Sequence, residues 1–152
     1  MVPALLINGG TSTTIQTSYT WQLMGYSTSG NVVYDSASGY TPSNGQYKPG
    51  TIGKYWVVFV ANNYWSTGGK NQSYPFAMTV GIAKNGISTI TASIQSVISF
   101  ANNCNCYNGN LFGAATINVT STTDYYNFAC YSDNTGITFN TTEWSWFKLL
   151  GV

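Results

Sequence analysis

Residues 55–60 read Tyr-Trp-Val-Val-Phe-Val, and this stretch decides the class of fold. Successive side chains of a β-strand point to opposite faces, so the odd-numbered residues share one face and the even-numbered residues share the other. Both faces of this predicted strand are therefore apolar. A small sandwich of two sheets buries only the inner face of each strand, so the second apolar face predicts another covering, for which a neighbouring subunit is the simplest source.

Strand signals recur along the chain as short runs rich in Val, Ile, Thr and aromatic residues, separated by Gly, Asn, Ser and Pro. Residues 76–83 alternate large and small side chains, and they end at Lys84-Asn85-Gly86, which is typical of a tight hairpin turn. Residues 87–100 fit both a strand and a helical stripe, and their Thr and Ser content favours a strand. The sequence therefore predicts an all-β sandwich of about eight strands, with one domain over residues 18–152.

The charge content excludes several classes of function. Only 6% of the 152 residues are charged, the net charge is +1, and the chain has no arginine and no histidine. A nucleic-acid-binding protein needs a basic face and normally reads bases with arginine, so we expect no nucleic-acid partner. The aromatic content of 16% indicates a folded chain. A surface built from Ser, Thr, Asn and Gly is typical of rigid β-rich assemblies.

We expect neither an enzyme nor a metal protein. Without histidine, the candidates for catalysis are four carboxylates, five lysines and three thiols. Asp124 and Asp133 flank a predicted strand, which places them about 25–30 Å apart, too far for the paired carboxylates of a glycoside hydrolase. Cys104, Cys106 and Cys130 cannot supply the four ligands of structural zinc, and Cys130 is interpreted as a small buried apolar residue. The sequence thus predicts no catalytic residue, metal or cofactor.

The first 17 residues are interpreted as an arm outside the domain. Their apolar side chains are Val2, Leu5, Leu6 and Ile7, a run that is too short to span a membrane and lacks the basic region of a signal peptide. We therefore expect no membrane insertion. Because these side chains would be a liability in water, an anchor on a partner is preferred to the alternative of a loose terminus.

Four segments resemble, in order, the complement-type globular head domains of the tumour-necrosis-factor-like jelly rolls. The segments are residues 31–40, 49–59, 80–86 and 144–150, the last reading Trp-Ser-Trp-Phe-Lys-Leu-Leu. Thr123 and Trp146 stand where the family usually has glycine, and residues 102–113 lengthen a loop. The resemblance implies a jelly roll of about 8–10 antiparallel strands without a cofactor. It also implies a homotrimer whose inner sheets make the contact.

The expected trimer interface consists of Trp56, Val58, Val60, Trp144 and Trp146. For the three tryptophans, a place in the core or elsewhere on the surface remains the alternative. The sequence shows neither the leader nor the Gly-x-y stalk of animal members of the family, so we expect a virion member, from a bacteriophage. The predicted function is a homotrimeric decoration, or cement, protein that binds the major capsid protein at the capsid surface and stiffens the shell.

The alternative function is the receptor- or glycan-binding head of a tail fibre or spike. In that case the expected outer loops, residues 62–74 and 102–113, would recognise host surface glycans. Their aromatic side chains would stack on the sugars, and these are Tyr64, Trp65, Tyr74 and Tyr107.

Overall fold

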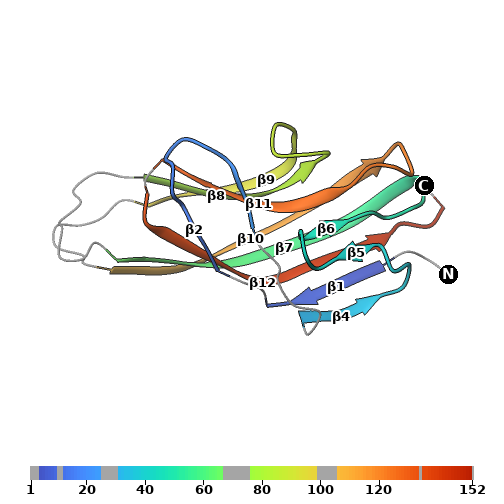
Figure 1. The fold of residues 1–152 in the computed structure, drawn as a ribbon, viewed down its shortest axis with the longest axis horizontal. Helices are drawn as coiled ribbons and strands as arrows, with labels where there is room; N and C mark the ends of the chain where they lie inside the picture. The colour runs from blue at the N-terminus through green and yellow to red at the C-terminus, as the bar shows by residue number, and fades with distance from the viewer. Residues whose placement is uncertain are drawn as a thin grey trace.

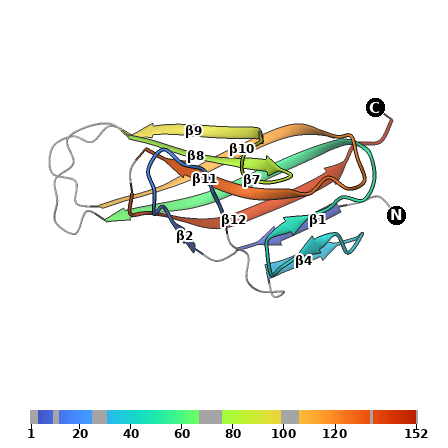
Figure 2. The same cartoon turned by 45° about the horizontal axis from the view of Figure 1, so that its top comes forward.

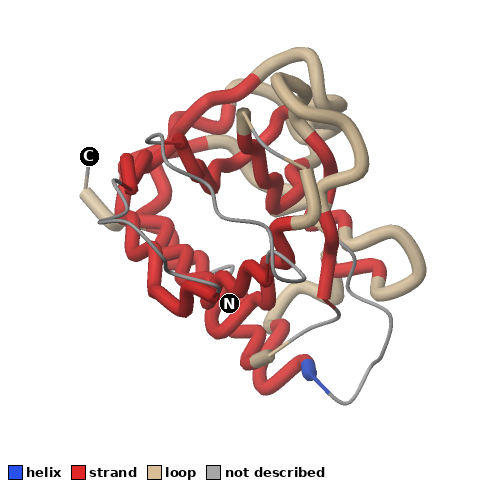
Figure 3. The backbone as a smooth tube through the Cα atoms, turned by 90° about the vertical axis from the view of Figure 1, so that its left-hand side faces the viewer, coloured by secondary structure: helices blue, strands red, loops and turns tan. Residues whose placement is uncertain are grey.

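The chain folds as two antiparallel sheets of six strands each, packed face to face, in a computed structural model. Figures 1 and 3 show the two layers. This arrangement confirms the prediction of an all-β jelly-roll sandwich. The structure describes residues 4–9, 12–24, 31–66, 76–98, 106–133 and 135–151, with side chains except at 63–66, 76, 93–98, 106–109 and 141–142.

The first sheet has the strand order β10-β7-β12-β1-β4, and β2 pairs with a second part of β12. Its strands are β1 (Ala4–Asn8), β2 (Ser12–Thr14), β4 (Val32–Asp35), β7 (Gly53–Ser66), β10 (Cys106–Val119) and β12 (Ile137–Lys148). The second sheet has the order β5-β6-β11-β8-β9, and β3 pairs with β11. Its strands are β3 (Gln22–Leu23), β5 (Tyr40–Thr41), β6 (Gln46–Tyr47), β8 (Phe76–Lys84), β9 (Ile90–Ile98) and β11 (Tyr126–Ser132).

The core between the sheets is rich in aromatic residues, and Trp144 and Trp146 lie fully buried within it. The ring of Trp146 is 4.8 Å from that of Tyr126 and 5.4 Å from that of Tyr47, both on the second sheet. Trp144 pairs with Phe59 in the register of β12 with β7, so the two tryptophans face inward with the odd-numbered residues of β7. The predicted interface role of Trp144 and Trp146 is therefore wrong, and the alternative of a core position holds.

The N-terminal segment is part of the sandwich. β1 pairs with β12 on one side and with β4 on the other, as Figure 2 shows. Leu5 and Ile7 pair with Trp146 and Trp144, and both side chains are fully buried because they complete the core beside these tryptophans. The prediction of an external arm is wrong for this segment, and Leu5 and Ile7 cannot anchor the folded chain to a partner. Val2 lies outside the described residues.

Residues 62–66 and 106–113, which were expected in outer loops, belong instead to long strands. β7 continues to Ser66 and β10 begins at Cys106, with unbroken pairing from Ser66–Cys106 to Gly53–Val119. The backbone hydrogen bonds between β7 and β10 continue through the Asn and Gly residues that suggested loops, because each strand supplies the backbone partners of the other. Figure 1 shows both strands running to the end of the sandwich away from β5 and β6.

Candidate functional site

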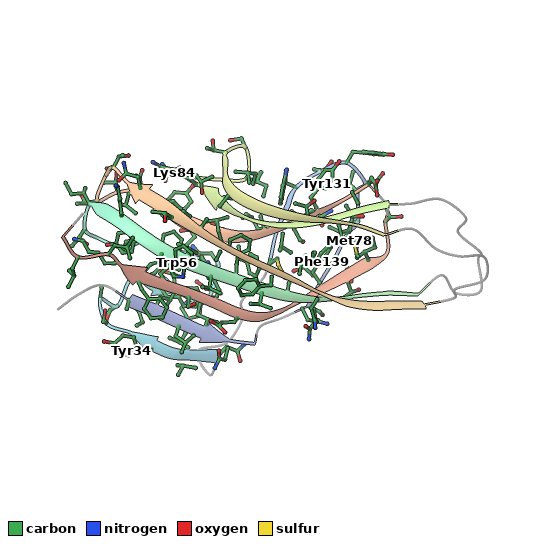
Figure 4. The ribbon with its side chains drawn as sticks, turned by 180° about the vertical axis from the view of Figure 1, so that it is seen from behind. Tyr34, Trp56, Met78, Lys84, Tyr131 and Phe139 are labelled. Atoms are coloured by element: carbon green, nitrogen blue, oxygen red, sulfur yellow. The ribbon has the colours of Figure 1, made fainter. Side chains whose placement is uncertain are left out.

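The outer face of the first sheet carries a continuous set of apolar side chains, which we call the apolar face. Even-numbered residues of β7 point to this side, and their partners on the neighbouring strands continue the pattern. Phe112 pairs with Val60 on one side of β7, and Phe147 pairs with Trp56 on the other. The apolar face consists of Leu6, Tyr34, Trp56, Val58, Val60, Phe112, Ala114 and Phe147. Figure 4 looks onto this sheet and labels Trp56 on β7 and Tyr34 on β4.

The aromatic members of this face are unusually exposed. Trp56 is 43% exposed, Phe147 45%, Tyr34 50% and Phe112 63%. Since a large aromatic side chain has an accessible area of about 150–250 Å², these four rings together leave roughly 400 Å² in contact with solvent. A monomeric protein rarely exposes an apolar patch larger than a few hundred Å², so this face has the character of a contact surface.

Charged groups are sparse on the apolar side of the sheet. Among the outward-pointing side chains that the structure describes on β10, β7, β12, β1 and β4, the charged ones are Lys54 and Glu143. Glu143 is half-buried and accepts a hydrogen bond of 3.0 Å from the hydroxyl of Ser145, which lies fully buried between its apolar neighbours. A partner for this surface must therefore be mainly apolar, because a strongly charged surface would find almost no complementary charge.

Of the predicted interface residues, the structure brings three together on the apolar face, namely Trp56, Val58 and Val60. Of the three predicted anchor residues that the structure describes, Leu6 lies there. Sequence reasoning missed Tyr34, Phe112 and Phe147. Phe147 was missed because only the pairing of β12 with β7 determines which face of residues 144–150 turns outward, and Phe112 was assigned to a loop.

Three of the four predicted aromatic ligand residues have a described backbone. Tyr64 and Trp65 lie in β7 and Tyr107 lies in β10, and Trp65 and Tyr107 are direct partners across the two strands. Tyr74 lies outside the described residues. The structure therefore places Tyr64, Trp65 and Tyr107 in paired strands, and not in the loops that were predicted to form a ligand site.

Asp124 organises the turns at one end of the sandwich. Its carboxylate forms an ion pair of 2.9 Å with the Lys84 ammonium and accepts hydrogen bonds from the Asn85 side chain at 2.9 Å and from the Ser121 backbone N–H at 3.1 Å. The hydrogen bond from Asn85, followed by the contact with Lys84, lowers the pKa of Asp124 to about 2. The network joins the β8–β9 turn to the β10–β11 turn, so Asp124 has a structural role.

The other two aspartates also accept hydrogen bonds from backbone N–H groups. Asp35 accepts hydrogen bonds from the backbone N–H groups of Gly39 at 3.1 Å and Tyr40 at 2.8 Å. Asp133 accepts one from the Ala77 N–H at 2.9 Å. In these contacts each of the three carboxylates faces N–H donors or a lysine ammonium.

The described part of the chain has neither a cluster of metal-ligating side chains nor a helix that could cross a membrane. No group of three or more His, Cys, Asp or Glu side chains there is placed to hold a metal ion. Within the same residues, no helix has the length and hydropathy to cross a membrane.

Comparison with known proteins identifies the fold. No family model and no curated protein matches the sequence. The globular domain of the zebrafish complement 1qA protein is similar in structure, with 11% identity, a TM-score of 0.60 and 97% of each chain covered. Murine APRIL is similar at pH 8.0, with 10% identity and a TM-score of 0.61, and at pH 5.0, with 12% identity and a TM-score of 0.58. Both APRIL comparisons cover 98% of this chain and 100% of the other. These similarities support the jelly-roll architecture over the whole chain.

Proposed function

We propose that this protein is a non-enzymatic binding domain that works as a homotrimer, in which neighbouring copies cover the apolar face. The observation that carries this proposal is the group of exposed aromatic side chains on the first sheet. A second copy is the favoured partner because it offers a surface of the same apolar character. The trimer is the form that the resemblance to the complement-type heads implies, and the common fold supports it.

The area of the apolar face fits this role. A stable interface buries about 800 Å² on each partner, and about half of that can come from the four exposed rings alone. Aromatic residues at the centre of an interface contribute most of the binding energy, and surrounding aliphatic and polar groups exclude water. Trp56 has such a central place, because Phe147 and Thr116 flank it on the neighbouring strands.

The finer function that we propose is decoration of a virus capsid by this trimer, with the major capsid protein as its second partner. The sparse charge and the polar Ser, Thr and Asn surface support it. Since Leu5 and Ile7 are buried in the core, attachment must use surfaces other than the predicted N-terminal anchor. Peptide mass spectrometry of purified virions tests this localisation, and absence of the protein from particles that contain the other capsid components would contradict it.

The assembly is tested by native mass spectrometry and light scattering of the purified protein. The single chain has a mass of 16.5 kDa, and we expect three times this mass in dilute neutral buffer. A monomer over the whole concentration range would refute the proposal, because the apolar face would then be stable in water. A dimer would refute the trimer but would agree with the apolar face as an interface between copies.

The alternative, a glycan-binding head, remains a second hypothesis. Its support is the pairing of Trp65 with Tyr107 at the far end of β7 and β10, which places both residues at one end of the sandwich. A glycan array probed with the assembled protein tests it. Binding that survives replacement of both aromatic residues by alanine would contradict this assignment.

A further inference from the structure

A polar pocket lies away from the apolar face, at the end of the sandwich where the β4–β5 turn, the β5–β6 hairpin and the start of β11 meet. Its volume is about 350 Å³. The lining residues come from these turns and from the link to β7, and they are Ala37, Ser38, Gly39, Thr41, Gln46, Lys48, Gly50 and Tyr125. None of them belongs to the apolar face, so the pocket is a separate site.

We propose that this pocket binds a single acidic sugar residue, a pyranose ring that carries a carboxylate. This inference goes beyond the proposed assembly and does not depend on it. The volume is at the lower end of the range of about 300–1,000 Å³ that small-molecule sites occupy, so it suits one ring better than a peptide or an extended ligand.

The charge of the lining selects an anion. Lys48 is the one charged side chain among the lining residues, and it is exposed. The Asp35 carboxylate accepts hydrogen bonds from the N–H groups of Gly39 and Tyr40 and keeps its negative charge, so a bound carboxylate must lie at Lys48 and away from this part of the lining. A single ammonium group matches a single carboxylate, whereas phosphate recognition normally gathers several cationic or N–H donors around one group.

The neutral groups select a ligand with hydroxyls. Ser38 and Thr41 contribute hydroxyl groups, and Gln46 contributes an amide that can donate and accept. Such mixed donors and acceptors pair with the hydroxyls of a sugar, which both donate and accept. Tyr125 adds a half-buried aromatic side chain to the wall, and aromatic rings pack against the C–H face of a sugar ring.

The walls of the pocket are organised without a ligand. Gly39 approaches the backbone of Lys48 so closely that a Cβ at Gly39 would lie 2.2 Å from the Lys48 carbonyl oxygen. The Lys48 N–H donates a hydrogen bond of 2.8 Å to the Gly39 carbonyl, which fixes the backbone from which the lysine side chain projects. Binding therefore does not require these segments to become ordered, and this lowers its entropic cost.

The experiment is an NMR titration of the isotope-labelled protein with glucuronate, glucose, acetate and inorganic phosphate. We expect glucuronate to bind with a dissociation constant of about 1–10 mM, as a single weakly bound sugar would, and to shift the amide signals of residues 37–50 and Tyr125. Glucose and acetate should each bind at least about tenfold more weakly, because each lacks one half of the recognised chemistry.

Lys48→Gln is the decisive variant, with Lys54→Gln as its matched control, since both lysines are exposed and Lys54 lies on the first sheet. Lys48→Gln should weaken glucuronate at least about tenfold, and Lys54→Gln should leave it unchanged. The proposal is overturned if glucuronate does not bind, if glucose or phosphate binds equally well, or if Lys48→Gln has no effect. The mass of each sample is measured in parallel, so failure of the pocket is distinguished from failure of the trimer.

Discussion

Replacing Trp56 by alanine tests the apolar face most directly. With 43% of the side chain exposed, about 110 Å² of Trp56 remains available for a partner in each copy. At about 25 cal/mol for each Å² of apolar area buried, the lost contact is worth about 2–3 kcal/mol for each copy. Because three copies lose this contact, the trimer is destabilised by about 8 kcal/mol relative to three monomers.

This loss predicts a large change in the concentration at which the trimer dissociates. About 8 kcal/mol corresponds to nearly six orders of magnitude in the trimer dissociation constant. The midpoint concentration varies as the square root of that constant, so it should rise about a thousandfold. Sedimentation velocity over a dilution series, with fluorescence detection at the lowest concentrations, measures this midpoint.

Leu23→Ala is the matched control. Leu23 is 41% exposed, close to the value for Trp56, but it lies on β3 in the second sheet, opposite Ala129. Its replacement should leave the midpoint unchanged. Equal effects of the two substitutions, or no effect of Trp56→Ala, would refute the assignment of the interface to the first sheet. Thermal unfolding of both variants separates loss of assembly from loss of folding.

Further predictions concern the turns and the core. Asp124→Asn removes the charge that Lys84 and Asn85 contact, so we expect the free energy of unfolding in urea to fall by about 2–3 kcal/mol; an unchanged value would show that the network is not stabilising. The pKa of Asp124 is lowered from 3.8 to about 2 in the folded chain, so its stabilising effect is complete above pH 3.8 and is lost as the pH falls through about 2. Acid unfolding should show this component in the wild type and not in Asp124→Asn. Gly39→Ala places a methyl group against a backbone oxygen at 2.2 Å, and we expect a loss of about 3 kcal/mol, measured by thermal unfolding; a loss below about 1 kcal/mol would contradict the tight packing. Burial raises the pKa of the Cys130 thiol to about 12, so iodoacetamide should label it only after denaturation, and peptide mapping would reveal any labelling of the native protein.

The class of fold could be predicted because it depends on local patterns. Residues 55–60 alternate so regularly that their strand and its two apolar faces follow from a period of two. Residues 87–100 fit both the period of a strand and that of a helix. Pairing with β8 determines that residues 90–98 form strand β9. Cys130 is buried, as its apolar sequence neighbours indicated.

The positions of the tryptophans could not be predicted, because they depend on register. Residues 144–150 have apolar side chains on both faces, and only the pairing of Trp144 with Phe59 determines which face turns inward. A shift of one residue would have placed Trp144 and Trp146 on the outer face and Phe147 in the core. Local sequence contains no information on that choice.

The place of the N-terminal segment depends on contacts across nearly the whole chain. Leu5 and Ile7 pair with Trp146 and Trp144, so the apolar run that suggested an anchor completes the core of its own domain. The pocket also depends on contacts between segments that are distant in sequence, since Gly39, Lys48 and Tyr125 meet only when three separate turns converge. Each turn was visible in the sequence, but their convergence was not.

The two outer faces of the sandwich differ in how much apolar surface they expose to solvent. On the second sheet, Thr79, Ala83 and Ala129 point outward, yet they are buried or nearly so, because they are small and their neighbours cover them. The ring of Tyr131 on the same sheet packs at 5.5 Å against that of Trp21. Among the side chains that the structure describes on that face, Leu23 is exposed but Thr79, Ala83 and Ala129 are covered within the chain, whereas the apolar face of the first sheet leaves four aromatic side chains exposed. We therefore place the proposed self-association on the first sheet and the proposed ligand in the pocket among the β5 and β6 turns.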